Sequence, residues 1–387
     1  MVDYGIMTYY KTYNYGSALQ AYALYREVTA LGYSCKMLDY RPDFLNSCSP
    51  LQKAIGIIKR LFPAFYRRVF WGWQFKLKKE RFVNFYQNYL KESKPYDSKE
   101  ALYLAQKEFR GIICGSDQIW TPTPNGYDDA YVLSFADDDL RKVAYAPSIG
   151  YPNILPLYRE TMKRGIEHFD ALSIREPHGA EIIQELTGKT AEVVLDPTFL
   201  LNKEDWKQFS KAPSEKEPYI FCYFLGKRQE ARILAKKLKK LTGYSLIIAP
   251  MWNRDTLWAD QVRMDIGPQE FIGLIQNAAY VCTDSYHATI LSINLNTSFY
   301  TFSRHTEHDP ENQNLRITEI LDMFGLKERY LESAAELICP LQVNFSSANC
   351  KLNKMRRQSF EYLQGALIFD KGGSFVHSGK GRPGHLT

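Results

Sequence analysis

The stretch KAPSEKEPYIFCYFL, which runs from Lys211 to Leu225, decides how the chain is divided. Its first eight residues contain two prolines and four charged side chains, a composition typical of a linker. The next seven, from Tyr219 to Leu225, are apolar and aromatic and indicate a buried strand. Because strand-like runs also precede the linker, we expect one domain on each side of it.

Strand-like runs alternate with amphipathic stretches along the whole chain. Before the linker, the runs are Tyr4 to Tyr10, Cys35 to Tyr40, Gly111 to Cys114, Lys142 to Pro147, Ala171 to Arg175 and Ala191 to Leu195. From its end onward, they are Tyr219 to Leu225, Tyr244 to Pro250, Tyr280 to Asp284 and Ser298 to Phe302. Strands joined by helical crossovers form mainly parallel sheets, whose ligand sites lie at the carboxyl ends of the strands. We therefore predict two α/β domains in tandem, with functional residues just after these strands.

The predicted N-terminal domain covers residues 1–212 and contains a basic, aromatic helical insertion at about 51–95. The predicted C-terminal domain covers residues 218–340. A helical segment follows at 341–370, and we expect it to pack back across the first domain. The tail at 371–387 is Gly-rich and basic, which predicts disorder.

The composition excludes several classes of protein. Of the 387 residues, 45% are hydrophobic and 24% are charged, which excludes a disordered chain, a collagen and a coiled coil. The seven cysteines are scattered without a CxxC pair, which argues against a disulfide framework and against a zinc site. No segment reaches the ~18 apolar residues of a membrane span, and the first residues lack the features of a secretory leader. We therefore expect a cytoplasmic protein.

Most of the positive charge lies in the insertion. From Leu51 to Pro95, eleven Lys and Arg face two Glu, so this segment carries +9 and the rest of the chain −3, which gives the total of +6. Aromatic residues such as Trp71 and Trp73 are interleaved with these charges. Such a segment, here about residues 53–81, is typical of a helix at an anionic membrane surface, and equally of a solvated basic face on a core-packed helix. The first alternative places the protein at the inner face of the membrane. We expect no nucleic-acid partner, because no binding motif accompanies the charge.

The motif TYNYGSALQAYAL at residues 12–24 follows the first strand. Asn14 and Gly16 suit a tight turn, and Ser17 is a natural N-cap. The apolar helix behind them points the positive end of its dipole at the expected ligand site, where it favours an anion. An ordinary turn from strand to helix is the alternative.

The motif ICGSDQIW at residues 113–120 follows another strand. Ser116 and Asp117 lie at its carboxyl end, where a carboxylate can act as a base or bind sugar hydroxyls. Trp120 is placed to stack on the face of a sugar. The alternative is an aspartate that caps the next turn.

Two further strand ends carry cationic candidates. Arg175 ends the run Ala171 to Arg175, and its guanidinium suits a phosphate or a carboxylate. In the motif VCTDSYHATILSINL, Ser285 and Tyr286 form a polar turn before His287, which opens an apolar helix and is placed for proton transfer. Arg304, directly after the last strand, is another candidate for binding an anion. The alternatives are a salt bridge for the arginine and a buried capping role for the histidine.

Six motifs in register resemble the polysaccharide pyruvyl transferase family. They are NYGSALQAYAL, GSDQIW, VAYAPSIG, SIRE, VVLDPTFLL and TDSYHATILS, and the resemblance extends from about Gly5 to Leu326. It implies a GT-B-like fold, in which two Rossmann-like domains face each other across a cleft. It also implies transfer of the enolpyruvyl unit of phosphoenolpyruvate onto a sugar of a capsule, an exopolysaccharide or the cell wall. The product is a pyruvate ketal, phosphate is released, and no metal or organic cofactor is implied.

The same resemblance suggests roles for individual residues. Arg175 occupies the place of the arginine that binds phosphoenolpyruvate, and His287 matches the essential histidine. Ser285 stands where many members carry an arginine, so Arg304 or the helix N-terminus would have to replace that charge. We expect Arg175 to clamp the donor, His287 to act as general acid or to assist the leaving phosphate, and Asp117 to act as base or to bind an acceptor hydroxyl.

Two other functions remain open at this level. A nucleotide-sugar-dependent glycosyltransferase would use the same architecture, because a fold does not determine the chemistry. A noncatalytic glycan-binding descendant of such an enzyme would explain Ser285. The acceptor of a pyruvyl transferase could be a sugar or a lipid-linked oligosaccharide.

Overall fold

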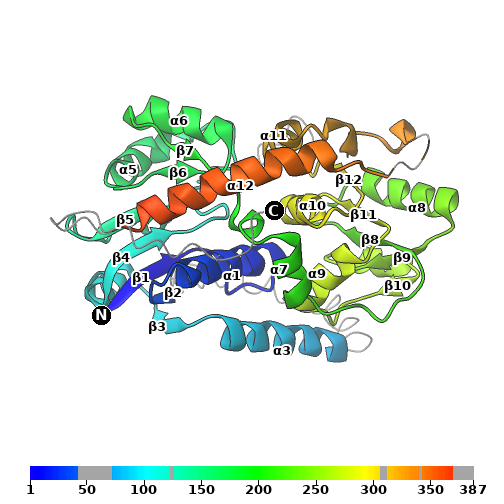
Figure 1. Cartoon of the computed structure of the whole chain (residues 1–387), viewed down its shortest axis with the longest axis horizontal. Helices are drawn as coiled ribbons and strands as arrows, with labels where there is room; N and C mark the ends of the chain where they lie inside the picture. Colours follow the sequence, from blue (N-terminus) through cyan, green and yellow to red (C-terminus); the bar gives the residue numbers. More distant parts are fainter. Residues whose placement is uncertain (42–71, 123–125, 306–311, 338, 340–341, 369–387) are drawn as a thin grey trace, which may run out of the picture.

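The computed structural model describes residues 1–41, 72–122, 126–305, 312–337, 339 and 342–368. Two parallel sheets form the frame of the molecule (Figure 1). The first has the strand order β3-β2-β1-β4-β5. Its strands are β1 (Val2–Met7), β2 (Cys35–Tyr40), β3 (Glu92–Tyr96), β4 (Phe109–Cys114) and β5 (Arg141–Ala144).

The second sheet has the order β10-β9-β8-β11-β12-β13. Its strands are β8 (Tyr219–Tyr223), β9 (Ser245–Ile248), β10 (Gln261–Val262), β11 (Tyr280–Thr283), β12 (Phe299–Phe302) and β13 (Tyr330–Leu331). A pair of short strands, β6 (Ser173–Ile174) and β7 (Glu192–Val193), lies beside the first sheet, to which a bridge between Val143 and Ala171 connects it. In both sheets the central strands are buried on both faces, which explains their apolar sequences.

Helices connect the strands and cover the sheets. They are α1 (Tyr15–Ala30), α3 (Gly72–Tyr89), α4 (Lys99–Ala105), α5 (Pro156–Glu167), α6 (Pro177–Thr187), α7 (Lys203–Phe209), α8 (Glu230–Thr242), α9 (Pro268–Gln276), α10 (Tyr286–Leu295), α11 (Leu315–Phe324) and α12 (Ser346–Ala366). Helices α1 and α10 each follow a central strand and are buried along most of their length, since both halves of the molecule pack on them.

Each strand-like run recognised in the sequence overlaps a strand, although the strand is usually shorter than the run. Three strands were missed: β3, β10 and β13. All three lie at the edge of a sheet, and β3 has the sequence ESKPY, with charged side chains and a proline. Edge strands tolerate such residues because one side of the strand forms no ladder. Apolar periodicity therefore does not reveal them.

The two halves are joined by a continuous core. The ring of Tyr15 on α1 stacks on that of Phe271 on α9, with centroids 4.3 Å apart, and its hydroxyl donates to the carbonyl of Ile266. Asn294 on α10 donates to the carbonyls of Thr198 and Leu201, each at 2.9 Å. These contacts fix the carboxyl ends of the two sheets next to each other.

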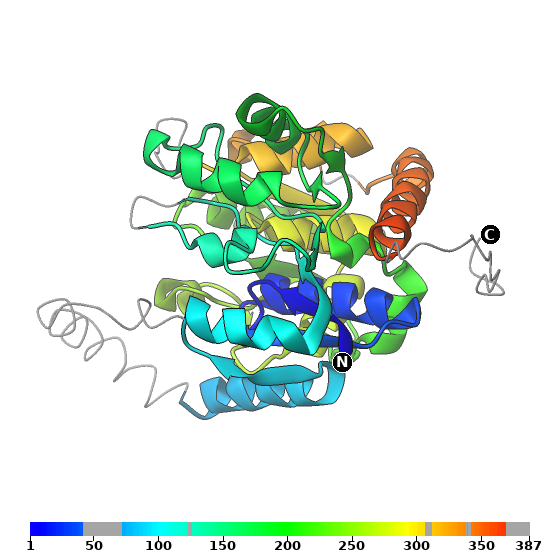
Figure 2. The ribbon, with the colours of Figure 1, turned by 90° about the vertical axis from the view of Figure 1, so that its left-hand side faces the viewer.

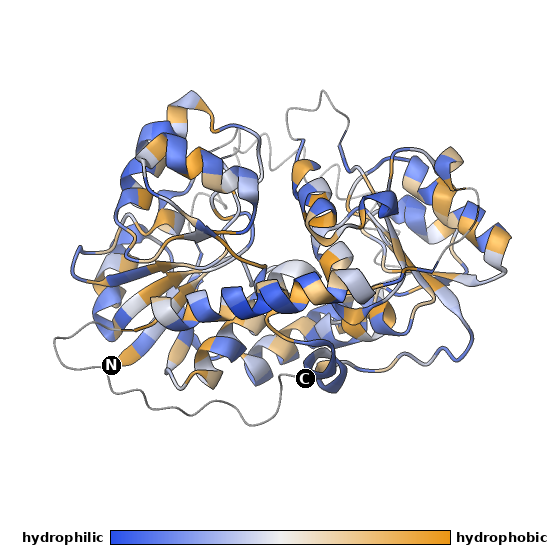
Figure 3. Cartoon of the chain, turned by 45° about the horizontal axis from the view of Figure 1, so that its top comes forward, coloured by the Kyte–Doolittle hydropathy of each residue, from blue (hydrophilic) through white to orange (hydrophobic). Residues whose placement is uncertain are grey.

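The last helix crosses from the second half to the first, as predicted (Figures 1 and 3). Near its C-terminal end, the hydroxyl of Tyr362 donates to the carbonyl of Ala144, and the hydroxyl of Ser359 accepts from the amide of Leu195. Nearer its start, Arg356 donates to Asn294 at 2.8 Å. Figure 3 shows hydrophobic and hydrophilic residues alternating along α12, which fits a helix with one side packed on both halves.

The basic insertion is described only in part. Residues 51–71, with Trp71 among them, lie outside the described residues, as does the predicted tail at 371–387. Helix α3 packs through Phe82, Phe85 and Tyr86, and Arg81 forms an ion pair with Asp265 at 2.9 Å. In Figures 1 and 2, α3 and α12 lie on different sides of the molecule. Among the described residues, no helix is long and apolar enough to span a membrane.

Candidate functional site

Four strand ends supply the side chains of the candidate site. Asp117 follows β4, Arg175 follows β6, Asp196 follows β7, and His287 lies in the first turn of α10, after β11. The first three belong to the first half of the molecule and His287 to the second. The prediction that functional side chains follow the strands thus leads to a cluster between the two halves.

Asp196 is the centre of the cluster. Its Oδ2 accepts from Nη1 of Arg175 at 2.9 Å and from the hydroxyl of Ser116 at 3.1 Å. Its Oδ1 accepts from the amide and the hydroxyl of Thr198 at 3.0 and 2.8 Å. The Nε2 atom of His287 lies 3.6 Å from Oδ2. One fully buried carboxylate therefore orients an arginine and faces a histidine from the other half.

The charges of this cluster stabilise one another. Burial alone would raise the pKa of Asp196, but His287 and the Arg175 guanidinium outweigh it and hold that pKa well below its ordinary value. Burial would likewise lower the pKa of Arg175, and Tyr286, Asp196 and Glu176 together raise it instead. Asp196 is thus an anion and Arg175 a cation at any physiological pH.

The imidazole ring of His287 packs closely against the start of α1. A Cβ added to Gly16, the second residue of α1, would stand 2.2 Å from Nδ1 of His287. The glycine therefore lets the helix start approach the imidazole ring. Among the described residues, Nε2 of His287 has no hydrogen-bond partner, since 3.6 Å to Asp196 is too long for one. This nitrogen is available to a ligand.

Asp117 lies beside the cluster in a strained conformation. Its φ of 76° falls in the left-handed region, which aspartate tolerates better than most residues. Oδ2 accepts from the hydroxyl of Ser17 at 2.6 Å, and Oδ1 accepts from the amide of Gln118 at 2.8 Å. Backbone strain of this kind often occurs at functional sites.

The predicted residues around α10 and α1 serve partly as caps. Ser285 is the N-cap of α10 and accepts from the amide of Ala288. Asn14 is the N-cap of α1 and accepts from the amide of Gly16 at 2.9 Å. Arg304 donates to the carbonyl of Asp284 at 3.4 Å, close to the start of α10.

Trp120 does not reach the cluster. Its indole is fully buried and donates to the carbonyl of Tyr131 at 2.9 Å, and its ring packs edge-on against Phe169. The ring fills the core of the first half and offers no face to a sugar in this structure. The expectation that Trp120 stacks on a ligand is therefore not met.

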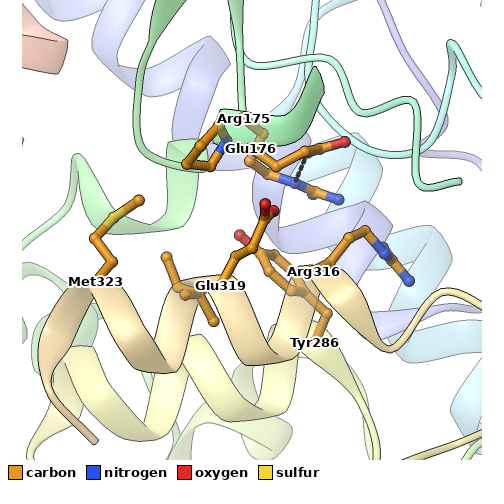
Figure 4. Close-up of a pocket in the computed structure, with 8 residues that line it drawn as sticks. Arg175, Glu176, Tyr286, Arg316, Glu319 and Met323 are labelled. Carbon is orange, nitrogen blue, oxygen red and sulfur yellow. Dashed lines mark ion pairs between the residues drawn. The ribbon is translucent and has the colours of Figure 1, made fainter. Parts of the chain in front are cut away.

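A hollow of about 210 Å³ lies next to the cluster (Figure 4). Its lining residues are Arg175, Glu176, Pro177, Tyr286, Arg316, Glu319, Ile320 and Met323. A second hollow of about 200 Å³ shares Glu176, Arg316 and Glu319 with it and extends toward Tyr151 and His178. The walls come from the start of α6 on one side and from α10 and α11 on the other, so the space lies between the two halves.

Sequence reasoning missed three residues of this site. Asp196 belongs to the motif VVLDPTFLL, and its place directly after a strand-like run was a signal that could have revealed it. Arg316 and Glu319 lie on α11, one turn apart, and no strand end marks them. Among the described residues, no group of three or more His, Cys, Asp or Glu is arranged to hold a metal ion.

Two parallel sheets with a charged cluster at their facing carboxyl ends define a two-domain α/β protein of the GT-B-like class. The family model for polysaccharide pyruvyl transferases matches residues 14–306, and the chain belongs to this family. The protein is accordingly a transferase of polysaccharide biosynthesis. No curated protein matches the chain.

Solved structures with the same architecture include two epimerases. A putative UDP-N-acetylglucosamine 2-epimerase from Listeria monocytogenes is 10% identical with a TM-score of 0.50, and the alignment covers 90% of this chain and 94% of that one. The UDP-GlcNAc 2-epimerase from Methanocaldococcus jannaschii is also 10% identical with a TM-score of 0.50, and the alignment covers 91% of each chain. At this identity the similarity concerns the fold alone. It confirms the prediction of two Rossmann-like domains that face each other.

Proposed function

We propose that the protein transfers the pyruvyl unit of phosphoenolpyruvate onto a sugar of a surface polysaccharide or of its lipid-linked precursor. The product is a pyruvate ketal, and phosphate is released. The observation that carries this proposal is the buried group of Arg175, Asp196 and His287 between the two halves, beside a hollow lined by a second arginine. Family membership supports it independently.

The chemistry requires both a cation and a proton donor. Phosphoenolpyruvate carries a phosphate and a carboxylate, and an arginine binds such groups by charge-assisted hydrogen bonds. A sugar hydroxyl adds to C2 of the donor while C3 receives a proton. A second hydroxyl then displaces the phosphate from C2, which closes the ketal. The first step needs a general acid, and His287 with its unpartnered Nε2 is placed to serve as one.

The remaining residues hold the reacting groups. Asp196 has its oxygens occupied by Arg175, Ser116 and Thr198, so it positions Arg175 and faces His287 and takes no proton itself. Asp117 accepts a hydrogen bond from Ser17, and it binds the hydroxyls of the acceptor sugar or takes up their protons. No metal or organic cofactor takes part in this scheme.

Contact with an anionic membrane forms a further part of the proposal, because a lipid-linked acceptor lies at such a surface. Its support is the exposure of Trp73 (72%) and Phe75 (41%) on α3, next to Lys76 and Lys79. In this scheme the protein is cytoplasmic and binds the inner face of the membrane. Flotation with liposomes that contain or lack anionic lipid tests the contact, and absence of binding to either would reject it.

Ligand-dependent melting tests the donor. A ligand that binds only the native state raises the melting temperature with its concentration. We expect phosphoenolpyruvate to stabilise the wild-type protein, and Arg175→Ala to weaken that effect. We expect His287→Ala to fold and to lose phosphate release when an acceptor is present. Stabilisation by a nucleotide sugar alone would instead favour a glycosyltransferase.

A further inference from the structure

The second half of the molecule contributes a buried arginine that nothing in the sequence motifs marks. Arg316 lies in the first turn of α11, and its side chain lines both hollows. The ring of Tyr286 is close to two cations, with Cζ of Arg175 at 4.2 Å from its centroid and Cζ of Arg316 at 5.6 Å. Figure 4 shows Arg175 and Arg316 both close to this ring. Two guanidinium groups from opposite halves thus meet at one hollow.

Arg316 is not neutralised within the described part of the chain. The residue is 6% exposed, its Nη2 donates to the neutral Gln313 at 3.1 Å, and its Nε has no partner among the described residues. No ion pair joins it to Glu319, although the two residues lie one turn apart. A buried cation without an acidic partner costs free energy that a bound anion would recover.

Burial and the neighbouring arginines disfavour the charged form of Arg316 when no ligand is bound. Burial, and next the positive charges of Arg175 and Arg304, lower the pKa of Arg316 to about 9. Glu176 acts in the opposite direction but forms no ion pair with Arg316, because its Oε1 accepts from Ser148 and from the amides of Ile149 and Gly150, and its Oε2 faces Arg175 at 3.7 Å. The hollow is thus lined by two arginines and two glutamates, and Arg316 is the arginine that has no ion pair among the described residues.

We infer that Arg316 binds an anionic group of the donor, together with Arg175 on the opposite wall. It takes the place of the cation that position 285 lacks, since Ser285 is occupied as the N-cap of α10. The ligand is a compact molecule with a phosphate or carboxylate group, which can contact the arginines on both walls of the hollow. This inference rests on the proposed function for the identity of the donor, but the anion site itself does not.

Arg316→Gln separates this role from a structural one. Removal of an arginine with a structural role lowers the stability of the protein, whereas removal of an uncompensated buried cation does not. We expect Arg316→Gln to melt, without ligand, no lower than the wild type. Its Kd for phosphoenolpyruvate should rise about tenfold to a hundredfold, the effect of one charged hydrogen-bond partner. Arg316→Lys keeps the charge and should recover part of the affinity.

Arg329→Gln is the matched control. Arg329 is also a buried arginine of the second half, but it stacks on Tyr300 and bonds the exposed Glu328 at 3.2 Å, and it does not line either hollow. Its replacement should leave the Kd for phosphoenolpyruvate unchanged. All variants are compared by calorimetric titration and by melting with phosphoenolpyruvate, inorganic phosphate and a nucleotide sugar.

The outcomes distinguish the inference from the proposed function. Wild-type affinity in Arg316→Gln, with loss in Arg175→Ala, would overturn the inference and leave the proposed function standing. A large fall in the unliganded melting temperature of Arg316→Gln would also overturn it. If phosphate or a nucleotide sugar binds and phosphoenolpyruvate does not, the proposed function fails. In that case, weaker binding of the same ligand to Arg316→Gln would still support the anion site. A wild-type protein that binds none of the three ligands overturns both.

Discussion

Replacement of Asp196 by asparagine tests the central pair directly. The substitution keeps the size of the side chain and the acceptor for the amide and hydroxyl of Thr198. It removes the negative charge 2.9 Å from Nη1 of Arg175 and places an amide donor there. The Arg175 side chain is 1% exposed, so its charge is left in the interior without its nearest counterion, and only Glu176 remains at 3.7 Å. Breaking a buried pair in this way costs about 3–5 kcal/mol of stability.

Urea denaturation measures this loss, and Asp255→Asn provides a matched control. Asp255 pairs with Arg232 at 2.8 Å in the second half, and both side chains are buried. Both variants should lose comparable stability, but only Asp196→Asn should lose affinity for phosphoenolpyruvate. A loss below about 1 kcal/mol for Asp196→Asn would place the pair in the range of exposed ion pairs and refute the reasoning.

The pH dependence of the same comparison has a definite sign. The folded state holds the pKa of Asp196 below its ordinary value of 3.8. The stability that this carboxylate contributes is therefore complete above the unfolded pKa and is lost as the pH falls through the folded one. The difference in stability between wild type and Asp196→Asn should not shrink from pH 7 to pH 5, and the two proteins should converge only in strong acid. A difference that shrinks between pH 7 and pH 5 would contradict this assignment.

Two other substitutions test how the halves are fitted together. In a phosphate-release assay, Gly16→Ala should reduce kcat about a hundredfold, because the new methyl group would stand 2.2 Å from Nδ1 of His287 and displace the ring. Gly365→Ala is the control, since its methyl group meets no atom within 4 Å, and it should keep full activity. Asn294→Ala should lower the free energy of unfolding by about 1–3 kcal/mol, because two buried carbonyls of the first half lose their donor. An unchanged midpoint of urea denaturation would show that these hydrogen bonds do not hold the halves together.

Much of this architecture could be predicted from the sequence because its central strands are buried on both faces. Apolar runs such as the one from Tyr219 to Leu225 located these strands, and the residues just after them included Asp117, Arg175 and His287. The polar turn after a parallel strand is a local pattern, so one sequence is enough to find it. Trp120 shows where the reasoning stops, because the same pattern does not tell whether a ring enters the core or the ligand site.

Arg316 could not be found in the sequence for a different physical reason. It lies between Leu315 and Ile317 in an amphipathic helix, where an arginine ordinarily reaches solvent. Its burial arises only when α11 faces the start of α6 in the other half, and no local pattern encodes that encounter. The charge of Arg175 is already balanced by Asp196 from its own half, whereas Arg316 has no such counterion among the described residues. An anionic substrate that contacts both halves would supply the partner that Arg316 lacks.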